Sequence, residues 1–461
     1  MLQDILAPKK ALFATGAQTV LRGQENRNRR VVIRKGNLVS NLRSETRGIN
    51  AKVTQNGVSG FSSVAEFTPE AAERVLRAAT ENAAFLHTRV PRAVTLPPLA
   101  LQGAMTCPLV IRDQPQDRIL EACRSLDAYL AQTYPALSSR TVVYTEDSTD
   151  KLIYSSDGCS GHMLSPRCYI YVFLNAEAKD GSPLELFHAF GGLGSFEDHF
   201  TDLTWMYPQI QTLYEQLMDK REGVYAEAGT KTVILGGMMP GMLAHEAVGH
   251  TVEADLVLGG SVAGKLLGQR VASDLVSMVD YAHTAFDGTA PLPVYLDDEG
   301  VRAEDALLIE NGILVGYMHS RESAQRFETR PCGNARAWLF SDEPLIRMRN
   351  TAIHPGKNTL EELIASVDDG YYLIDTNNGE ADTTGEFMFG VTMGYEIKKG
   401  KLGRAILDTT ISGVAFDMLK TVDMVSDRVV WASSGYCGKK QIMPVGLGGP
   451  ALRCKITIGG R

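Results

Sequence analysis

Two histidines and a glutamate lie within six consecutive residues, His245-Glu246-Ala247-Val248-Gly249-His250. Neutral imidazole nitrogens are good zinc ligands, and a carboxylate beside them can take a proton from a metal-bound water whose pKa has fallen to about 7. The familiar zinc-protease motif is H-E-x-x-H, with the histidines four residues apart on one helix face. Here they are five residues apart, so the segment predicts metal chemistry in an unusual local geometry.

This spacing does not fit a regular α-helix. At about 100° per residue, residues five apart diverge by roughly 140°, so the two rings could not reach one ion. A single-turn π-bulge would absorb the extra residue and restore a shared face, and Gly249 could also let the helix loosen before His250. Two unrelated histidines are the alternative interpretation. A metal site therefore requires a π-bulge or a loosened turn between His245 and His250.

A catalytic zinc site usually has three protein ligands, so a third must come from elsewhere. The sequence offers five candidates: Glu253, Asp255, His319, His354 and Cys437. Cys437 lies between glycines that leave backbone room and beside lysines that would favour the thiolate, although a buried cysteine without function is the plainer interpretation. Glu253 could instead accept a hydrogen bond from a ligand imidazole.

Composition limits the classes of protein to consider. The 461 residues suffice for two or three domains with sizeable cores, and 44% hydrophobic and 22% charged residues are typical of globular proteins. A formal net charge of −8 argues against a general nucleic-acid-binding surface. No stretch approaches the ~20 apolar residues that span a bilayer, and the start lacks the features of a signal peptide. Seven cysteines without a CxxC pair suit a reducing compartment, so we expect a cytoplasmic protein.

The patterning predicts an α+β protein of two domains. Residues 1–224 form an N-terminal α+β domain with a strand hairpin turning at residues 35–37 and helices over about 69–86, 116–132 and 208–221. A Pro-rich linker covers residues 91–108. The basic run from Arg22 to Lys35 is interpreted as a solvated strand edge, with a nucleic-acid or partner patch as the alternative.

Residues 225–461 form a mainly antiparallel β domain that carries the histidine helix. Two more helices are expected, around 264–279 and over 360–367, the latter introduced by a Thr359/Glu362 capping box. The segment before the histidines consists of a strand, a loop and Pro240. It should bend the chain so that the metal helix enters beside sheet backbone. An extended peptide could then add to that sheet edge and lie across the ion. No phosphate loop, G-x-G-x-x-G or G-x-S-x-G is present.

Several further motifs, taken in order with the histidine segment, resemble the TldD/PmbA metalloproteases, once described as modulators of DNA gyrase. They are Asp297-Asp298-Glu299-Gly300-Val301, Ile309-Glu310-Asn311-Gly312-Ile313-Leu314, Gly316-Tyr317-Met318, Pro355-Gly356-Lys357, Cys437-Gly438-Lys439 and Pro444-Val445-Gly446. The similarity runs through nearly all of the second predicted domain. It is looser in the first, from Arg47-Gly48-Ile49 to Gly60-Phe61-Ser62 and the helix after Thr68.

The resemblance implies a zinc ion held by His245, His250 and Cys437, with Glu246 as the catalytic general base. It implies a peptidase for small unfolded or modified peptides, which acts with a related subunit as a heterodimer or with a second copy as a homodimer. Because all four residues are present, the chain resembles the active type of subunit. The alternative is a non-catalytic regulator that binds gyrase, or DNA through the basic run, and for which Glu246 would be dispensable.

Overall fold

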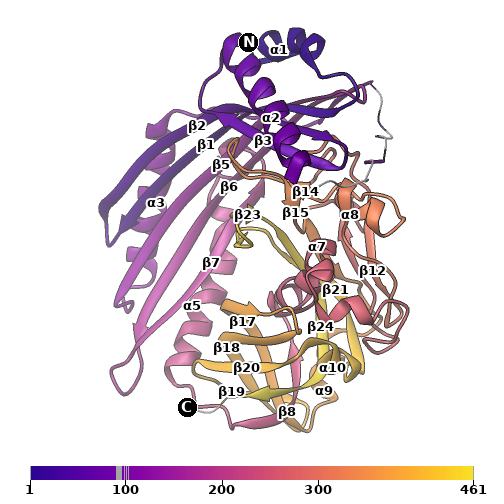
Figure 1. Ribbon diagram of the computed structural model, residues 1–461. Coiled ribbons are helices and arrows are strands. Elements are labelled where there is room, and N and C mark those ends of the chain that lie inside the picture. The colour runs from indigo at the N-terminus through magenta and orange to yellow at the C-terminus, as the bar shows by residue number, and fades with distance from the viewer. Residues whose placement is uncertain (1, 90–95, 98, 100, 102, 460–461) are drawn as a thin grey trace.

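The computed structural model describes residues 2–89, 96–97, 99, 101 and 103–459. They form two large sheets with helices packed on them, and most strand pairs are antiparallel, so the predicted α+β class is confirmed. In Figure 1 the long strands of the first sheet run diagonally beside the second, curled sheet. Residues up to 224 are called the N-terminal part below and later residues the C-terminal part. Their separation into domains at this point stays a prediction.

The first sheet pairs its described strands in the order β3-β2-β1-β5-β6-β4, and β7 also pairs with β6. The strands are β1 (Gln18–Arg34), β2 (Asn37–Gln55), β3 (Val58–Val64), β4 (Gly103–Thr106), β5 (Ser139–Ser155), β6 (Cys159–Glu177) and β7 (Pro183–Leu193). Two-residue turns at Lys35-Gly36 and Asn56-Gly57 have positive φ at both positions, as type I′ hairpins require. The turn predicted at 35–37 is confirmed. The predicted linker lies partly outside the described residues, and β4 occupies part of it.

The basic run does not form a solvated edge, because β1 lies between β2 and β5. Arg22 is only 1% exposed, and its Nη1 lies 2.8 Å from Asp298 Oδ1 in the C-terminal part. Arg29 is also buried and forms an ion pair with Asp113. The edge part of the interpretation is therefore wrong, because an interior strand has partners on both sides and the charges of these two arginines are neutralised within the protein. The remaining basic residues of the run, Arg27, Arg30, Arg34 and Lys35, are solvent-exposed as predicted.

Helices cover one face of the first sheet. Along β6, Cys168, Ile170 and Val172 are buried in a core shared with α3 and α5, whereas Arg167, Tyr169 and Tyr171 alternate onto the opposite face. The helical elements of this part are α1 (Leu2–Leu6), η1 (Ala7–Leu12), α2 (Pro69–Arg89), α3 (Gln116–Thr133), α4 (Phe196–His199), η2 (Thr204–Met206) and α5 (Tyr207–Arg221). The three helices predicted from periodicity are thus confirmed. The opposite face of β6 turns toward the C-terminal part.

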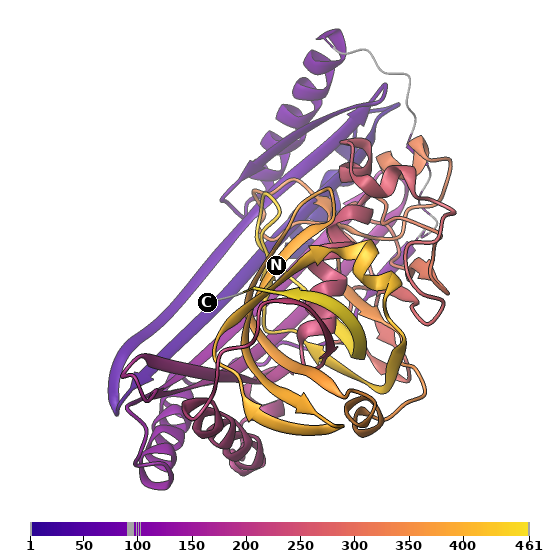
Figure 2. The same cartoon turned by 90° about the horizontal axis from the view of Figure 1, so that it is seen from below.

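The second sheet follows the order β13-β12-β9-β16-β24-β20-β18-β17-β8 among the described residues, with β19 on β18 and β21 on β24. A further pairing between β24 and β8 closes part of it into a ring, and Figure 2 shows the curl from below. The strands are β8 (Gly229–Leu235), β9 (Met278–Tyr281), β12 (Ala306–Glu310), β13 (Ile313–Leu314), β16 (Asn350–Ile353), β17 (Asp369–Ala381), β18 (Glu386–Lys398), β19 (Lys401–Ala405), β20 (Thr409–Val414), β21 (Met424–Ala432) and β24 (Gly446–Ile458).

One helix predicted in this part is wrong. Only the short η5 (Val262–Lys265) forms where 264–279 was expected to be helical, because Gly268 has a φ of +77°, which an α-helix cannot contain. The capping box of Thr359 and Glu362 is confirmed, and it begins α9 (Leu360–Ala365). The remaining elements are α6 (Met239–Met242), η3 (Leu243–Gly249), η4 (His250–Val252), α7 (Ala254–Leu258), β10 (Thr284–Ala285), β11 (Gly288–Thr289), α8 (Arg321–Arg326), β14 (Ala335–Arg336), β15 (Leu345–Ile346), α10 (Ala415–Lys420), β22 (Tyr436–Cys437) and β23 (Met443–Pro444).

Within the described ranges, no helix has the length and apolar character needed to cross a bilayer.

Candidate metal centre

The histidine segment enters the interior directly from the second sheet. β8 ends at Leu235, and Pro240 lies in the first turn of α6, where its missing N–H is not needed. A Cβ on Gly241 would lie 2.8 Å from the backbone nitrogen of Gly448, so the helix packs closely against the backbone of β24. The predicted entry of this helix beside sheet backbone is confirmed. Its apolar side chains are buried in the main core of the C-terminal part.

The extra residue between the histidines is absorbed by a π-helix, η3, which runs from Leu243 to Gly249. The backbone N–H of His250 donates to the carbonyl of His245, the i to i+5 bond that defines this geometry. Gly249 allows this segment to pack, since a Cβ there would lie 2.1 Å from Met348 Sδ. The π-bulge predicted from the spacing is therefore confirmed, and both imidazoles lie on one side of the helix.

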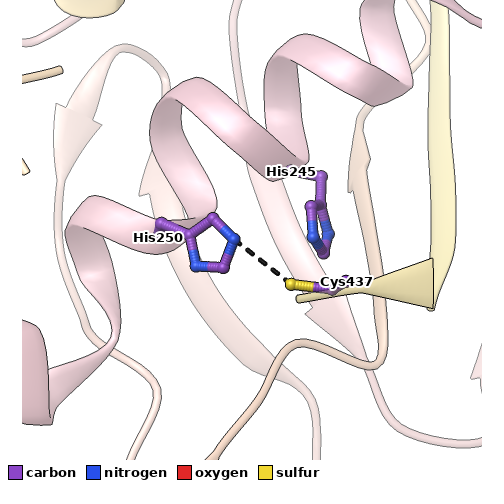
Figure 3. Close-up of side chains that lie close together, drawn as sticks. All are labelled: His245, His250 and Cys437. Atoms are coloured by element: carbon purple, nitrogen blue, oxygen red, sulfur yellow. Dashed lines mark hydrogen bonds between the residues drawn. The ribbon is translucent and has the colours of Figure 1, made fainter. Parts of the chain in front are cut away.

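Three possible metal donors converge at this helix. One ligand atom from each of His245, His250 and Cys437 lies within 4.8 Å of the others. Cys437 Sγ and His250 Nε2 are 3.3 Å apart, and the two imidazole rings are nearly perpendicular with centroids 5.2 Å apart. Figure 3 shows the histidines pointing from the helix toward Cys437, which β22 brings in from the opposite side. The structure thus places together the two histidines and the cysteine that the resemblance selected.

The other candidate ligands have partners elsewhere. Ring nitrogens of His319 and His354 bond to the hydroxyls of Ser323 and Tyr281, at 3.1 and 2.8 Å. Asp255 accepts two hydrogen bonds from Lys439, at 2.8 and 2.7 Å. None of the three joins the donor group found among the described residues.

The pKa values of His250 and Cys437 are shifted in opposite directions. Burial alone would raise the pKa of the Cys437 thiol, but the adjacent imidazoles of His245 and His250 lower it to about 3. Burial would likewise lower the pKa of His250, and its bonds to Cys437 and Glu253 outweigh this and raise it to about 10. Lys439, one of the two lysines expected to favour the thiolate, forms ion pairs with Asp255 and Glu253 instead.

The residues fit a zinc ion. His245 is fully buried, and neither of its ring nitrogens has a hydrogen-bond partner among the residues that the structure describes. A buried imidazole with two unpaired nitrogens is costly, and coordination would satisfy one of them. Two imidazoles and a thiolate form the mixed nitrogen and sulfur donor set that zinc prefers, and three protein donors leave a coordination position open.

Two glutamates flank the donors in different ways. The Glu246 carboxylate lies 3.9 Å from His245 Nε2 and 3.6 Å from His250 Nε2, and its side chain is 22% exposed, so it reaches solvent beside the donors. Glu253 is fully buried and bonds to His250 Nδ1 at 2.8 Å, which leaves Nε2 of that ring directed at Cys437. Glu246 is thus placed to meet a water or substrate, and Glu253 to orient a ring.

Sequence reasoning missed the residues that hold the Cys437 loop. Arg347 is fully buried and donates to the carbonyls of Cys437, Lys439 and Gln441, at 2.8, 3.2 and 2.6 Å. Arginines in an alternating strand pattern are usually solvent-facing, so composition gives no sign of this role.

Fold and site together indicate the class of metallopeptidases, and comparison with known proteins identifies the family. Family models match three consecutive stretches: PmbA/TldA metallopeptidase domain 1 at residues 20–83, the central domain at 110–235 and the C-terminal domain at 228–460. The chain therefore belongs to the PmbA/TldD family of metallopeptidases.

Individual relatives agree with this assignment. A metalloprotease from Methanothermobacter thermautotrophicus is 33% identical over 342 residues, which cover 72% of each chain. A zinc metalloprotease TldD homolog from Saccharolobus solfataricus is 35% identical over 253 residues, covering 54% of this chain and 56% of that one. The crystal structure of TldE from Thermococcus kodakarensis superimposes with a TM-score of 0.77 over all of both chains at 16% identity, which shows a shared fold.

Proposed function

We propose that this chain is a zinc-dependent peptidase in which His245, His250 and Cys437 bind the metal and Glu246 is the general base. The observation that carries the proposal is the convergence of three donor atoms beside a partly exposed carboxylate. The name of the Saccharolobus relative, a zinc metalloprotease, supports zinc over other metals, as does the donor set.

When bound, zinc supplies Lewis acidity that polarises a carbonyl and acidifies water. Glu246 takes the proton of the attacking water and delivers it to the leaving amine, because its carboxylate lies beside both histidine donors. Glu253 holds the His250 ring through Nδ1 and so fixes which nitrogen faces the metal position. Its own orientation is supported by Lys439, 3.2 Å away.

The proposed substrates are small unfolded or modified peptides, bound extended along a strand edge beside the site. We further propose that the chain works in the cytoplasm as a dimer, with a related subunit of the family or with a second copy. The likeness to the TldE structure supports a related subunit as the partner.

The test is a comparison of metal content and peptide cleavage in three proteins: wild type, Glu246→Gln and Cys437→Ser. We expect wild type to hold about one zinc per chain and to cleave a disordered peptide, with products identified by mass spectrometry and lost on chelation. Glu246→Gln should keep the metal and lose cleavage by at least about 100-fold, as removal of a general base does. Cys437→Ser should lose both. Full zinc occupancy in Cys437→Ser would refute the ligand set.

The same variants distinguish a non-catalytic regulator. Such a protein would keep its cellular function in Glu246→Gln, since a structural metal site has no need of that carboxylate. A peptidase would lose function in this variant although its fold and metal are intact.

A further inference from the structure

Cys437 lies in the two-residue strand β22, which pairs with β23 through Tyr436 and Cys437 within an otherwise irregular loop. The loop connects β21 to β23 and contains Gly435 and Gly438, at which an added Cβ would meet nothing within 4 Å. Both glycines and Tyr436 between them are exposed. Glycines in open space give a loop conformational freedom that packing does not remove. The pairing of β22 with β23 covers only two residues, so bonds from outside the loop contribute to the position of the thiol.

The C-terminal part anchors the second half of the loop. Arg347 donates to the carbonyls of Cys437, Lys439 and Gln441. Lys439 in turn donates to both carboxylate oxygens of Asp255 in α7, at 2.8 and 2.7 Å. The pairing of β22 with β23 holds Tyr436 within the C-terminal part, whereas the carbonyls of Ser433 and Ser434 are bonded from the N-terminal part.

The N-terminal part anchors the first half of the loop through β6. Tyr169 and Tyr171 donate their hydroxyls to the carbonyls of Ser433 and Ser434, each at 2.8 Å. Arg167 Nη1 donates to the Ser433 carbonyl at 3.0 Å. These donors come from residues more than 260 positions earlier in the chain. Three consecutive outward-facing side chains of one strand therefore end on two adjacent backbone carbonyls of the loop.

The anchor is rigid because β6 itself is well held. Arg167 is 1% exposed and binds Asp147 of β5 through two bonds, Nε to Oδ1 at 2.6 Å and Nη2 to Oδ2 at 2.5 Å. Tyr436 closes the arrangement: its hydroxyl bonds to Asp147, and the Arg167 guanidinium lies 4.9 Å from the centre of its ring. A bidentate pair of this kind fixes both position and orientation. The residue next to Cys437 is thus tied to the first sheet.

We propose that Arg167, Tyr169 and Tyr171 are positioning residues for the third metal ligand, so that the N-terminal part sets the metal affinity of a site formed by the C-terminal part. The inference rests on the proposed function, specifically on Cys437 as a ligand. If the loop loses these anchors, the fraction of molecules with the thiol in place falls, and the apparent metal affinity falls in proportion.

The experiment uses the full chain with Tyr169→Phe and Tyr171→Phe combined, which removes two hydroxyls and keeps both rings. Zinc affinity is measured by competition with a chelator, and the cysteine–metal bond is followed in the Co²⁺-loaded protein by its thiolate-to-metal charge-transfer absorption. We expect zinc affinity to fall about tenfold or more, as for other outer partners of metal ligands. The charge-transfer band should weaken or shift while the thermal stability of the metal-free protein stays near that of wild type.

The matched control is Tyr134→Phe combined with Tyr395→Phe, which also removes two hydroxyls. Tyr134 donates to Gln211, and Tyr395 donates to Asp219 across the two parts of the chain, each at 2.9 Å. The control should keep wild-type zinc affinity and an unchanged band. If the test pair does not fold, the single variants Tyr169→Phe and Tyr171→Phe replace it, each with the same two readouts.

The Cys437→Ser variant distinguishes a failure of the proposed ligand set from a failure of the positioning proposal. Wild-type zinc affinity in Cys437→Ser would refute the proposed ligand set. Weak binding in Cys437→Ser together with wild-type affinity and an unchanged band in the tyrosine variants would overturn the positioning proposal alone. An equal loss in the control pair would also overturn it, because the effect would then be general.

Discussion

At the scale of single residues, the candidate metal centre pairs a cationic imidazole with an anionic thiolate. His250 has a pKa raised to about 10 and Cys437 one lowered to about 3, so at neutral pH the imidazole is protonated and the thiol is not. A metal needs the neutral imidazole and the thiolate. The thiolate is therefore already present, and the proton on His250 is the one that must leave.

This predicts that zinc binding releases about one proton from His250 between pH 5 and 9. The apparent affinity should rise with pH up to the folded pKa of about 10, because the proton competes with the metal below that value. Calorimetric titrations in buffers of different ionisation enthalpy measure the proton count. A binding enthalpy independent of the buffer would contradict the predicted charge state.

Glu253 provides a second test at this scale. Glu253→Ala removes the acceptor of His250 Nδ1 but leaves the three donors in place. We expect zinc affinity to fall about 10- to 100-fold, the usual effect of losing such a partner. Glu362→Ala, which alters the capping box of the distant α9, is the control and should affect stability but not affinity. Unchanged affinity in Glu253→Ala would show that packing alone orients the ring.

Part of this site could be predicted from the sequence because two of its donors are local. The five-residue spacing of His245 and His250 requires a π-bulge once a shared ion is assumed, and the structure contains it. Cys437 is one of five candidates, suggested by its flanking glycines and lysines, and only the family resemblance selects it, because those neighbours do not distinguish a ligand from a buried thiol. Arg347 and the β6 anchors could not be found, because their partners are backbone carbonyls distant in sequence.

At the scale of elements, the π-helix depends on a close contact at Gly249. Gly249→Ala would bring a methyl group to 2.1 Å from Met348 Sδ, so the helix or the methionine must shift. We expect a loss of about 1–3 kcal/mol in unfolding free energy, typical of overpacking, and weaker zinc binding. Denaturant unfolding and chelator competition measure the two effects.

A second substitution separates strain from other causes. Met348→Ala makes room for the new methyl group, so the double variant should recover metal affinity relative to Gly249→Ala, although Met348→Ala alone costs stability through its cavity. Strictly additive effects of the two substitutions would argue against the contact as the origin.

The long strand β5 shows a feature that sequence patterning does not predict. β5 runs unbroken from Ser139 to Ser155, although residues 145–150 at its centre are all polar. The polar centre is buried because the C-terminal part covers that face, as the bonds from Lys151 to Asp298 show. Alternation in sequence reports which face a residue takes, but not whether another part of the chain covers it.

At the scale of the whole molecule, the two parts also meet around Lys220 of α5. Lys220 is 1% exposed and lies 2.6 Å from Asp408 Oδ1. Nearby Asp375 of β17 has a pKa raised from 3.8 to about 6, mainly by burial, although Lys220 partly offsets this. A raised folded pKa means that the folded protein holds a proton that the unfolded chain has already lost.

Because of the raised pKa of Asp375, we predict that the unfolding free energy falls as pH rises from about 4 to about 6 and does not fall further above pH 6 on account of this group. Asp375→Asn removes the titration and should raise the unfolding free energy by up to about 3 kcal/mol at pH 7, from a shift of roughly two pKa units. The gain should vanish near pH 4, where the wild-type carboxyl is protonated in the folded state. Urea unfolding at both pH values checks it, and an equal gain at both would contradict the pKa assignment.

The distance in sequence between the three donor residues determines when the site can form during synthesis and folding. Cys437 follows His250 by 187 residues, and most of the second sheet is made between them. During synthesis the histidines emerge long before the thiol, and a partly made chain carries two donors without the third. On the proposed ligand set, a chain made in this order gains its complete metal site, and with it the proposed peptidase activity, only once folding is nearly complete.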